Sequence, residues 1–281
     1  MTVLSVKGLC KSYEKFWLQD VSFDVRRGEI MGFIGRNGAG KTTTLKSLLN
    51  FVHPDSGDIR FFGMDFAENE LEIKGRIGFV SGGMDHYPRK KLRQISAVTK
   101  SFYPAWDNGE YRRFMELFSL DEGKTPAQLS AGMRVKYSLA LALSHRAELL
   151  MLDEPTSGLD PVSRDELLEI FLRLSREGVS ILFSTHITSD LDKCADRITY
   201  IRQGRIAASE DTESFKTRYL LTELKSGDIT DALRPHLIGC GVNRSGVTAL
   251  VEASSAAGLG IPTRPADLET IMVHLEKEGG I

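Results

Sequence analysis

The chain has 281 residues, of which 41% are hydrophobic and 26% charged, and its formal net charge is −2. These proportions are ordinary for a globular protein, and the length allows one large α/β domain and a smaller one. Because 36 basic residues are balanced by 38 acidic ones, no overall positive field would hold nucleic acid, and we expect no nucleic-acid partner.

Short features of the sequence indicate the cellular compartment of the chain. The N-terminal stretch has no long apolar core and no cleavage pattern, so we expect no signal peptide. The longest apolar runs, at 139–143 and 149–152, are too short to cross a bilayer. Three scattered cysteines without metal-binding spacing predict reduced thiols: Cys10, Cys194 and Cys240. We therefore expect a cytoplasmic chain that reaches a membrane only through a partner.

The first part of the chain alternates short strand-like and helix-like patterns. Apolar and polar side chains alternate over residues 1–60, which is typical of antiparallel strands. The run IMGFI at 30–34 is apolar throughout and predicts a buried strand, and KTTTLKSLLNFV at 41–52 predicts the helix after it. Residues 88–145 are mostly helical in pattern.

Buried strands and helices then follow one another. ELLMLD at 148–153 and VSILFS at 179–184 predict buried strands. The helix between them has Asp160 as its cap, Pro161 in its first turn and Gly178 after its end. Strands separated by helices predict a parallel sheet with crossover helices.

A change of composition after a hairpin-like stretch at 200–209 divides the chain. Residues 1–208 predict an α/β domain that includes a helical subdomain at about 85–145. Residues 209–281 predict a small accessory α/β domain that ends in a helix. One face of that helix is predicted to carry four apolar side chains: Leu268, Ile271, Met272 and Leu275.

The stretch GRNGAGKT at 35–42 fits the pattern G-x-x-x-x-G-K-[ST] between a strand and a helix. Its glycines let backbone N–H groups point inward, and the helix N-terminus adds positive potential, so the loop is suited to phosphate. Lys41 would reach the β- and γ-phosphates of ATP, and Thr42 would offer its hydroxyl to Mg²⁺. The loop residues predicted to contact nucleotide are Gly35, Asn37, Gly38, Gly40, Lys41, Thr42 and Thr43.

Polar residues follow the next two buried strands. Asp153 and Glu154 end the strand at 148–153, where ligands of parallel sheets usually bind. Asp153 would organise Mg²⁺ and its waters, and Glu154 would polarise the attacking water. His186, at the end of the following strand, would contact the γ-phosphate. A capping carboxylate or a structural histidine is the simpler interpretation of each residue alone, but the phosphate loop favours a joint site.

Together with LSAGMR at 129–134 and SGLDP at 157–161, these motifs resemble the ATP-binding subunits of ABC transporters. Five of the six motifs of that family stand in order, and the resemblance covers about residues 1–208. It implies a P-loop NTPase fold of the ABC-ATPase type. Such a fold has a parallel core sheet with flanking helices, an N-terminal antiparallel β-subdomain and a helical subdomain.

The resemblance also implies a head-to-tail dimer, with itself or with another ABC ATPase, that holds two ATP molecules between its subunits. Ser130 and Gly132, at the start of the signature helix, would meet the γ-phosphate across the interface. Asp160 would couple the two sites. Ala131 and Met133 depart from the family pattern, in which a glycine and a glutamine stand at these positions.

Tyr13 stands about where the family places an aromatic residue that stacks on adenine. Phe16 and Trp17 are close alternatives, and ordinary strand packing of Tyr13 is another.

The sixth family motif, a glutamine loop, is missing. Gly82 stands at the glutamine position, within SGGMDHYP at 81–88. Three interpretations remain open: Asp85 or His86 substitutes, water fills the gap while Glu154 carries the chemistry, or the site is a weak hydrolase tuned by its partner. We predict measurable but slow ATPase activity that Glu154→Gln abolishes.

The resemblance implies an ATPase that powers a transmembrane permease on a separate chain, at the inner face of the cell membrane. FYPAWD at 102–107 and RPADLETIMVHL at 264–275 resemble the ATPases of bacterial ABC-2-type, drug-efflux exporters. Four basic residues within 87–94 form either a solvated face or a docking site for permease or lipid headgroups. The alternatives are a soluble ABC protein acting on ribosomes, DNA or Fe–S assembly, and a module that senses ATP with weak turnover.

Overall fold

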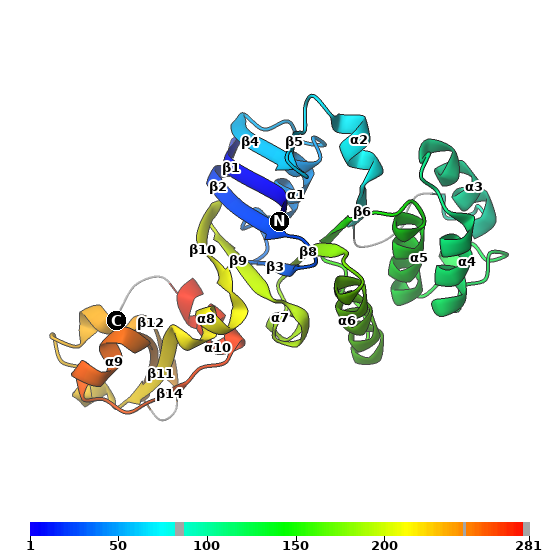
Figure 1. The fold of residues 1–281 in the computed structure, drawn as a ribbon. Coiled ribbons are helices and arrows are strands. Elements are labelled where there is room, and N and C mark those ends of the chain that lie inside the picture. The colour runs from blue at the N-terminus through cyan, green and yellow to red at the C-terminus, as the bar shows by residue number, and fades with distance from the viewer. Residues whose placement is uncertain (82–86, 244–245, 278–281) are drawn as a thin grey trace. The chain divides into compact units, whose positions relative to one another are not determined.

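The structure is a computed structural model that describes residues 1–81, 87–243 and 246–277 (Figure 1). Gly82, Asp85 and His86, on which the interpretations of the missing glutamine depend, lie outside the described residues. The chain forms two compact units, Met1–Ser209 and Glu210–Ile281.

The first unit begins with a four-stranded antiparallel sheet in the order β2-β1-β4-β5. Exposed and buried side chains alternate along β2, because successive residues of a strand point to opposite faces of its sheet. The antiparallel strands predicted within residues 1–60 are therefore present. The strands are β1 (Thr2–Ser12), β2 (Trp17–Arg26), β4 (Ser56–Phe61) and β5 (Met64–Asp65).

The core of this unit is a six-stranded sheet in the order β10-β9-β3-β8-β7-β6. Strands β9, β3, β8, β7 and β6 pair in parallel, as the alternation of strands and helices predicts. Every residue of β3, β7 and β8 is buried, which explains their continuous apolar runs. The strands are β3 (Ile30–Ile34), β6 (Ile77–Ser81), β7 (Leu149–Asp153), β8 (Ser180–Thr185), β9 (Arg197–Arg202) and β10 (Arg205–Asp211).

Helices α1 (Lys41–Leu48), α2 (Glu70–Gly75), α6 (Pro161–Arg176) and α7 (Thr188–Cys194) belong to the same unit. The boundaries predicted for α6 are confirmed, since Asp160 caps it and Gly178 follows it with a φ of 92°. The predicted end of α1 is wrong by four residues. Asn50 has a φ of 59°, a left-handed conformation that asparagine tolerates and that ends a helix.

The helical subdomain consists of α3 (Leu92–Phe102), α4 (Asn108–Leu117), a short 3₁₀ turn (Pro126–Gln128) and α5 (Ala131–Ser144). Three buried hydroxyls join its helices. Ser96 Oγ lies 2.7 Å from both Tyr111 Oη and Tyr137 Oη, and Tyr137 Oη donates to Leu92 O at 2.9 Å. Because one residue of this cluster comes from each helix, the cluster sets the position of α5 relative to α3 and α4.

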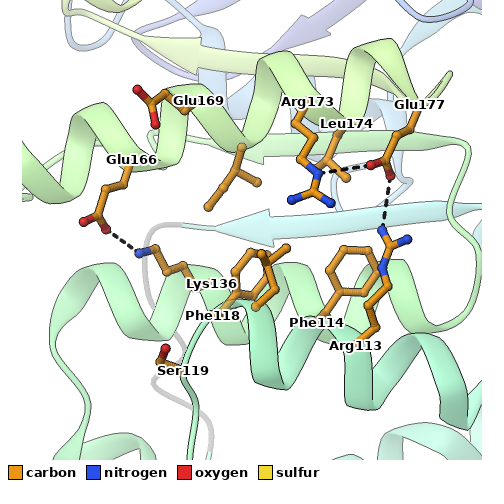
Figure 2. A pocket seen from close by; sticks show the side chains of 12 residues that line it. Arg113, Phe114, Phe118, Ser119, Lys136, Glu166, Glu169, Arg173, Leu174 and Glu177 are labelled. Carbon is orange, nitrogen blue, oxygen red and sulfur yellow. Dashed lines mark hydrogen bonds and ion pairs between the residues drawn. The ribbon is translucent and has the colours of Figure 1, made fainter.

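Helix α6 faces the helical subdomain across a groove of about 530 Å³ (Figure 2). Two ion pairs cross the groove: Lys136 Nζ to Glu166 Oε2 at 2.6 Å, and Arg113 to Glu177 at 3.2 Å. Apolar side chains, Phe114 among them, lie between the pairs. These contacts brace α5 and α4 against α6.

The second unit holds a four-stranded antiparallel sheet in the order β12-β13-β11-β14. Its strands are β11 (Tyr219–Leu224), β12 (Ile238–Asn243), β13 (Gly246–Glu252) and β14 (Thr263–Pro265). Its helices are α8 (Thr212–Thr217), α9 (Ala253–Leu259) and α10 (Leu268–Glu276), with 3₁₀ turns at Ser226–Asp228 and Arg234–His236.

The predicted apolar face of α10 is correct for Leu268, Ile271 and Met272, which are buried. The fourth residue, Leu275, is half-buried, and His274 beside it is buried as well. His274 Nδ1 lies 2.5 Å from Gly239 O, and this backbone partner satisfies the imidazole inside the unit.

No helix among residues 1–81, 87–243 and 246–277 is long and apolar enough to span a membrane.

Candidate nucleotide-binding site

The phosphate loop joins the buried strand β3 to α1 and requires its glycines. A Cβ at Gly40, whose φ is 118°, would come within 2.6 Å of Leu18 Cδ2 and 2.9 Å of Phe16 Cζ. A Cβ at Gly35 would lie 2.4 Å from Ile201 O. The close approach of surrounding chain therefore leaves room only for glycine at these two positions.

Lys41 is buried, with 5% of its surface exposed, and its ammonium group is held inside the loop. Nζ donates to Gly35 O at 2.7 Å and to Arg36 O at 3.3 Å, and it lies 3.2 Å from Glu154 Oε1. A buried ammonium group needs such partners, since desolvation penalises the charged form. The lysine is thus positioned at the loop rather than directed into solvent.

The carboxylate of Asp153 lies where three parts of the unit meet. Thr42 Oγ1, in the first turn of α1, donates to Asp153 Oδ1 at 3.1 Å. Ser184 Oγ, on the neighbouring strand β8, donates to the same oxygen at 2.7 Å. The contact with Ser184 follows from the parallel register, which sets Asp153 of β7 beside it.

Glu154 follows β7 in a left-handed conformation, with a φ of 50°. Its backbone N donates to Ser184 Oγ at 2.9 Å, which helps to hold this conformation. Its Oε2 lies 2.8 Å from His186 Nδ1, while Oε1 faces Lys41. The Glu154 carboxylate therefore lies between a lysine and a histidine, at the carboxyl ends of the parallel strands of the core sheet.

Direct contacts thus bring five predicted site residues together: Lys41, Thr42, Asp153, Glu154 and His186. Ser184 was missed, although its single hydroxyl orients both acidic residues. The only signal in the sequence is its place two residues before His186, at the end of a strand.

Ser130 caps α5, as predicted, with Oγ accepting from Met133 N at 3.2 Å. Gly132 is buried, and a Cβ there would lie 3.2 Å from Ser163 Cβ on α6. The partners that the structure gives Ser130 and Gly132 are Met133 and α6.

Asp160 caps α6 by accepting from the backbone N of Val162 and Ser163 at 3.1 and 3.0 Å. Ser163 Oγ also donates to Asp160 Oδ2 at 2.6 Å. This hydroxyl, together with the two backbone N–H groups, lowers the pKa of the Asp160 carboxyl. Asp160 is therefore held ionised at the exposed start of α6.

The aromatic residues considered for adenine lie around the turn between β1 and β2. Phe16 and Trp17 line a hollow of about 830 Å³ together with Gly38 of the phosphate loop. Lys15, Arg202 and Arg205 are further lining residues, but Tyr13 is not. The structure therefore places Phe16 and Trp17, rather than Tyr13, in the same hollow as the phosphate loop.

The residues of the site fit a magnesium–nucleotide complex. Thr42 Oγ1 and Asp153 Oδ1 are hard oxygen donors only 3.1 Å apart. Mg²⁺ prefers such donors and usually takes one or two from protein, with phosphate and water supplying the rest. The loop next to them packs too closely against its surroundings for a Cβ at Gly35 or Gly40, and its backbone N–H groups suit phosphate oxygens.

Comparisons with known proteins show the family of the chain. The family model described as "ABC transporter" matches residues 18–157. The bacitracin transport ATP-binding protein BcrA of Bacillus licheniformis is 32% identical over 221 residues, which are 77% of this chain and 72% of that protein. A solved ATP-binding subunit of an ABC transporter is 30% identical, with a TM-score of 0.69, over 76% of this chain and 92% of that chain.

The chain therefore belongs to the ATP-binding proteins of ABC transporters, and its fold is that of a P-loop ATPase. The probable multidrug ABC transporter ATP-binding protein YbhF of Escherichia coli (strain K12) is another relative. It is 32% identical over 223 residues, which are 77% of this chain and 38% of that protein.

Proposed function

We propose that this chain hydrolyses ATP and thereby powers a separate membrane permease of an ABC exporter. The observation that carries the proposal is the carboxylate of Glu154, set between Lys41 and His186 beside the glycine loop. A general base close to a phosphate cradle is the arrangement that water attack on a γ-phosphate requires.

ATP would bind through the inward backbone N–H groups of the loop and through Lys41, with Asn37 and Thr43 as further contacts. Thr42 and Asp153 would hold Mg²⁺, which when bound neutralises charge on the β- and γ-phosphates. Lys41 would exchange its contact with Glu154 for one with these phosphates. That exchange would leave the Glu154 carboxylate available to water.

Glu154 would then accept a proton from the attacking water. His186 supports this role because its Nδ1 lies 2.8 Å from Oε2 and holds the carboxylate in one orientation. With Nδ1–H facing the carboxylate, Nε2 would donate to a γ-phosphate oxygen in the form of the ring that carries a proton on both nitrogens. Both groups act on charge that develops during the reaction, where positioned donors and acceptors contribute most.

The working unit would be a dimer of this chain, or of this chain and another ABC ATPase. Ser130 and Gly132 support a contact in trans, because they start an α-helix of 14 residues whose N-terminus is suited to phosphate. Asp160, at the exposed start of α6, would couple the two sites.

Docking of a permease is supported by the outer face of α3. Val98 and Phe102 are 58% and 75% exposed there, and Ile95, about one turn before Val98, is half-buried. Four exposed basic residues precede or begin this helix: Arg89, Lys90, Lys91 and Arg93. An apolar stripe with a basic border suits a permease segment at the inner membrane surface. The chain would thus be peripheral to the cytoplasmic face of the membrane.

Export is supported by the printed functions of two relatives, bacitracin transport and probable multidrug transport. The cargo itself would be selected by the permease.

The test is steady-state ATP hydrolysis by the purified chain with its permease. We expect slow turnover that Glu154→Gln abolishes while ATP still binds, because the base is lost and the phosphate loop is intact. Glu169→Gln, on the exposed side of α6, is the matched control and should keep the parental rate. Tight ATP binding without any hydrolysis by the parent would overturn the proposal in favour of an ATP-sensing module.

A further inference from the structure

A buried carboxylate that the proposed mechanism does not use lies behind the site. Asp190 is in the first turn of α7, four residues after His186, and only 1% of it is exposed. Its Oδ2 accepts from Thr156 Oγ1 at 2.6 Å. Thr156 is fully buried and stands two residues after Glu154. One hydrogen bond therefore ties the segment that follows β7 to the segment that follows β8.

The second oxygen of Asp190 faces α6. Arg164 Nε lies 3.9 Å from Asp190 Oδ1, and neither buried atom has a hydrogen-bond partner among the described residues. Arg164 stands one turn after Asp160, and its backbone N donates to Asp160 O at 3.0 Å. The carboxylate is thus in reach of three segments, which carry Glu154, His186 and Asp160.

This arrangement is costly for stability. Burial raises the pKa of the Asp190 carboxyl; the Thr156 hydroxyl, Arg164 and His186 oppose the shift, and Glu154 adds to it. A buried charge with an incompletely bonded oxygen is less favourable than an apolar side chain of similar size. Such features are concentrated at functional sites, where geometry matters more than stability.

We propose that Asp190 is a positioning residue for ATP hydrolysis. Through Thr156 it fixes the backbone that carries Glu154 relative to His186. Through Arg164 it connects these two segments to the loop that carries Asp160. The inference rests on the proposed ATPase activity. Closure of a partner subunit onto Asp160 would then be transmitted to the general base. Asp190 itself touches neither phosphate nor water.

The test is the separation of turnover from ATP capture in variants of the hydrogen bond. Thr156→Val removes the hydroxyl at nearly constant volume. A hydrogen bond to a charged group is typically worth 1.5–3 kcal/mol, so we expect kcat to fall by about 10- to 100-fold. KM for ATP should change by no more than about twofold, since Lys41 and Thr42 are untouched. Thr156→Ser, which restores the hydroxyl, should recover most of the turnover.

Asp190→Asn supplies an independent variant in case Thr156→Val does not fold. Its amide has one oxygen for two neighbours that both donate, so it must lose either the Thr156 bond or the approach of Arg164. We expect a clear loss of kcat measured well below its Tm, with KM for ATP close to that of the parent, although Tm itself should fall because Arg164 loses its charged partner.

Parental kcat in Thr156→Val, or in Asp190→Asn well below its Tm, would overturn the inference and leave the ATPase proposal standing. Absence of turnover in the parent itself would instead overturn both.

Discussion

Lys41 has its ammonium group surrounded by two carbonyls and one carboxylate, so its charge is already directed at the place where phosphates would bind. A control substitution on the same helix can separate the role of Lys41 in ATP binding from any effect on the stability of α1. Lys46 lies on the same helix and is exposed, which makes it a matched control.

Lys41→Ala should weaken ATP binding by about 10- to 100-fold, the value of one or more hydrogen bonds to a charged group. Lys46→Ala should bind as the parent does. Titration with a fluorescent ATP analogue measures both. Equal affinity of Lys41→Ala and the parent would contradict the placement of the triphosphate in this loop.

The aromatic residue that stacks on adenine is also decided at the level of single side chains. Tyr13 and Trp17 are both about half exposed, but only Trp17 lines the hollow beside Gly38. Stacking on an aromatic ring is worth about 1–3 kcal/mol for a base.

Alanine at the residue that stacks should therefore weaken ATP binding by about 5- to 150-fold. It should leave the affinity for inorganic tripolyphosphate unchanged, since that ligand has no base. Competition titrations of Tyr13→Ala, Phe16→Ala and Trp17→Ala with both ligands show which residue stacks. If a variant loses affinity for ATP and for tripolyphosphate equally, the substitution has disturbed the phosphate loop and not the stacking on adenine.

Among the elements, α5 depends on a buried hydroxyl. Tyr137 is fully buried, and its Oη contacts Ser96 on α3 and donates to Leu92 O. Tyr137→Phe removes both contacts without changing the packing of the ring. We expect a loss of about 1–2 kcal/mol in the free energy of unfolding, measured by urea denaturation. Tyr87→Phe, at a residue 65% exposed, should lose nothing; an equal loss would show that the buried cluster is not the cause.

Helix α4 should show a pH-dependent cap. Asp107 accepts from the backbone N of Gly109 and Glu110, and Arg146 donates to its other oxygen at 2.9 Å. The Arg146 guanidinium and these N–H groups lower the pKa of the carboxyl. A lowered folded-state pKa stabilises the fold above the unfolded pKa of about 3.9, and the gain is lost as pH falls through the folded value.

Asp107→Asn keeps the cap but not the charge. It should be less stable than the parent at neutral pH, and the difference should close below the pKa of the native carboxyl. Thermal unfolding between pH 7 and about pH 2.5 measures the difference, with Asp24→Asn, at an exposed residue of β2, as the control. If the difference in stability between Asp107→Asn and the parent is the same at all pH values, the Asp107 carboxylate is not its cause.

At the scale of the whole molecule, the nucleotide site is predicted to be completed by a second subunit. Glu154→Gln should trap a dimer in the presence of ATP and Mg²⁺, because hydrolysis no longer separates the subunits. Light scattering after size-exclusion chromatography would detect it. The double variant Glu154→Gln with Ser130→Arg should remain monomeric, since a large cation replaces the cap that we propose to face the partner. A dimer of equal stability in both variants would contradict the trans contact.

The sequence alone determined the features that depend on local geometry. The phosphate loop, the caps Ser130 and Asp160, and the buried strands are specified by residues close in the chain. Their φ angles, N–H donors and apolar periodicity are local properties, so a short pattern is enough. The end of α1 was missed because the apolar run continues past Asn50, where the backbone turns left-handed.

Only the tertiary structure decided which side chains meet across strands and helices. Ser184 meets Asp153, and Thr156 meets Asp190, through the parallel register of β7 and β8 and the packing of α7. His274 is buried in the second unit because a carbonyl of β12 lies opposite it. These contacts join residues 31 to 35 positions apart, and no local pattern encodes them, because strand register and helix packing are set by the burial of the whole core.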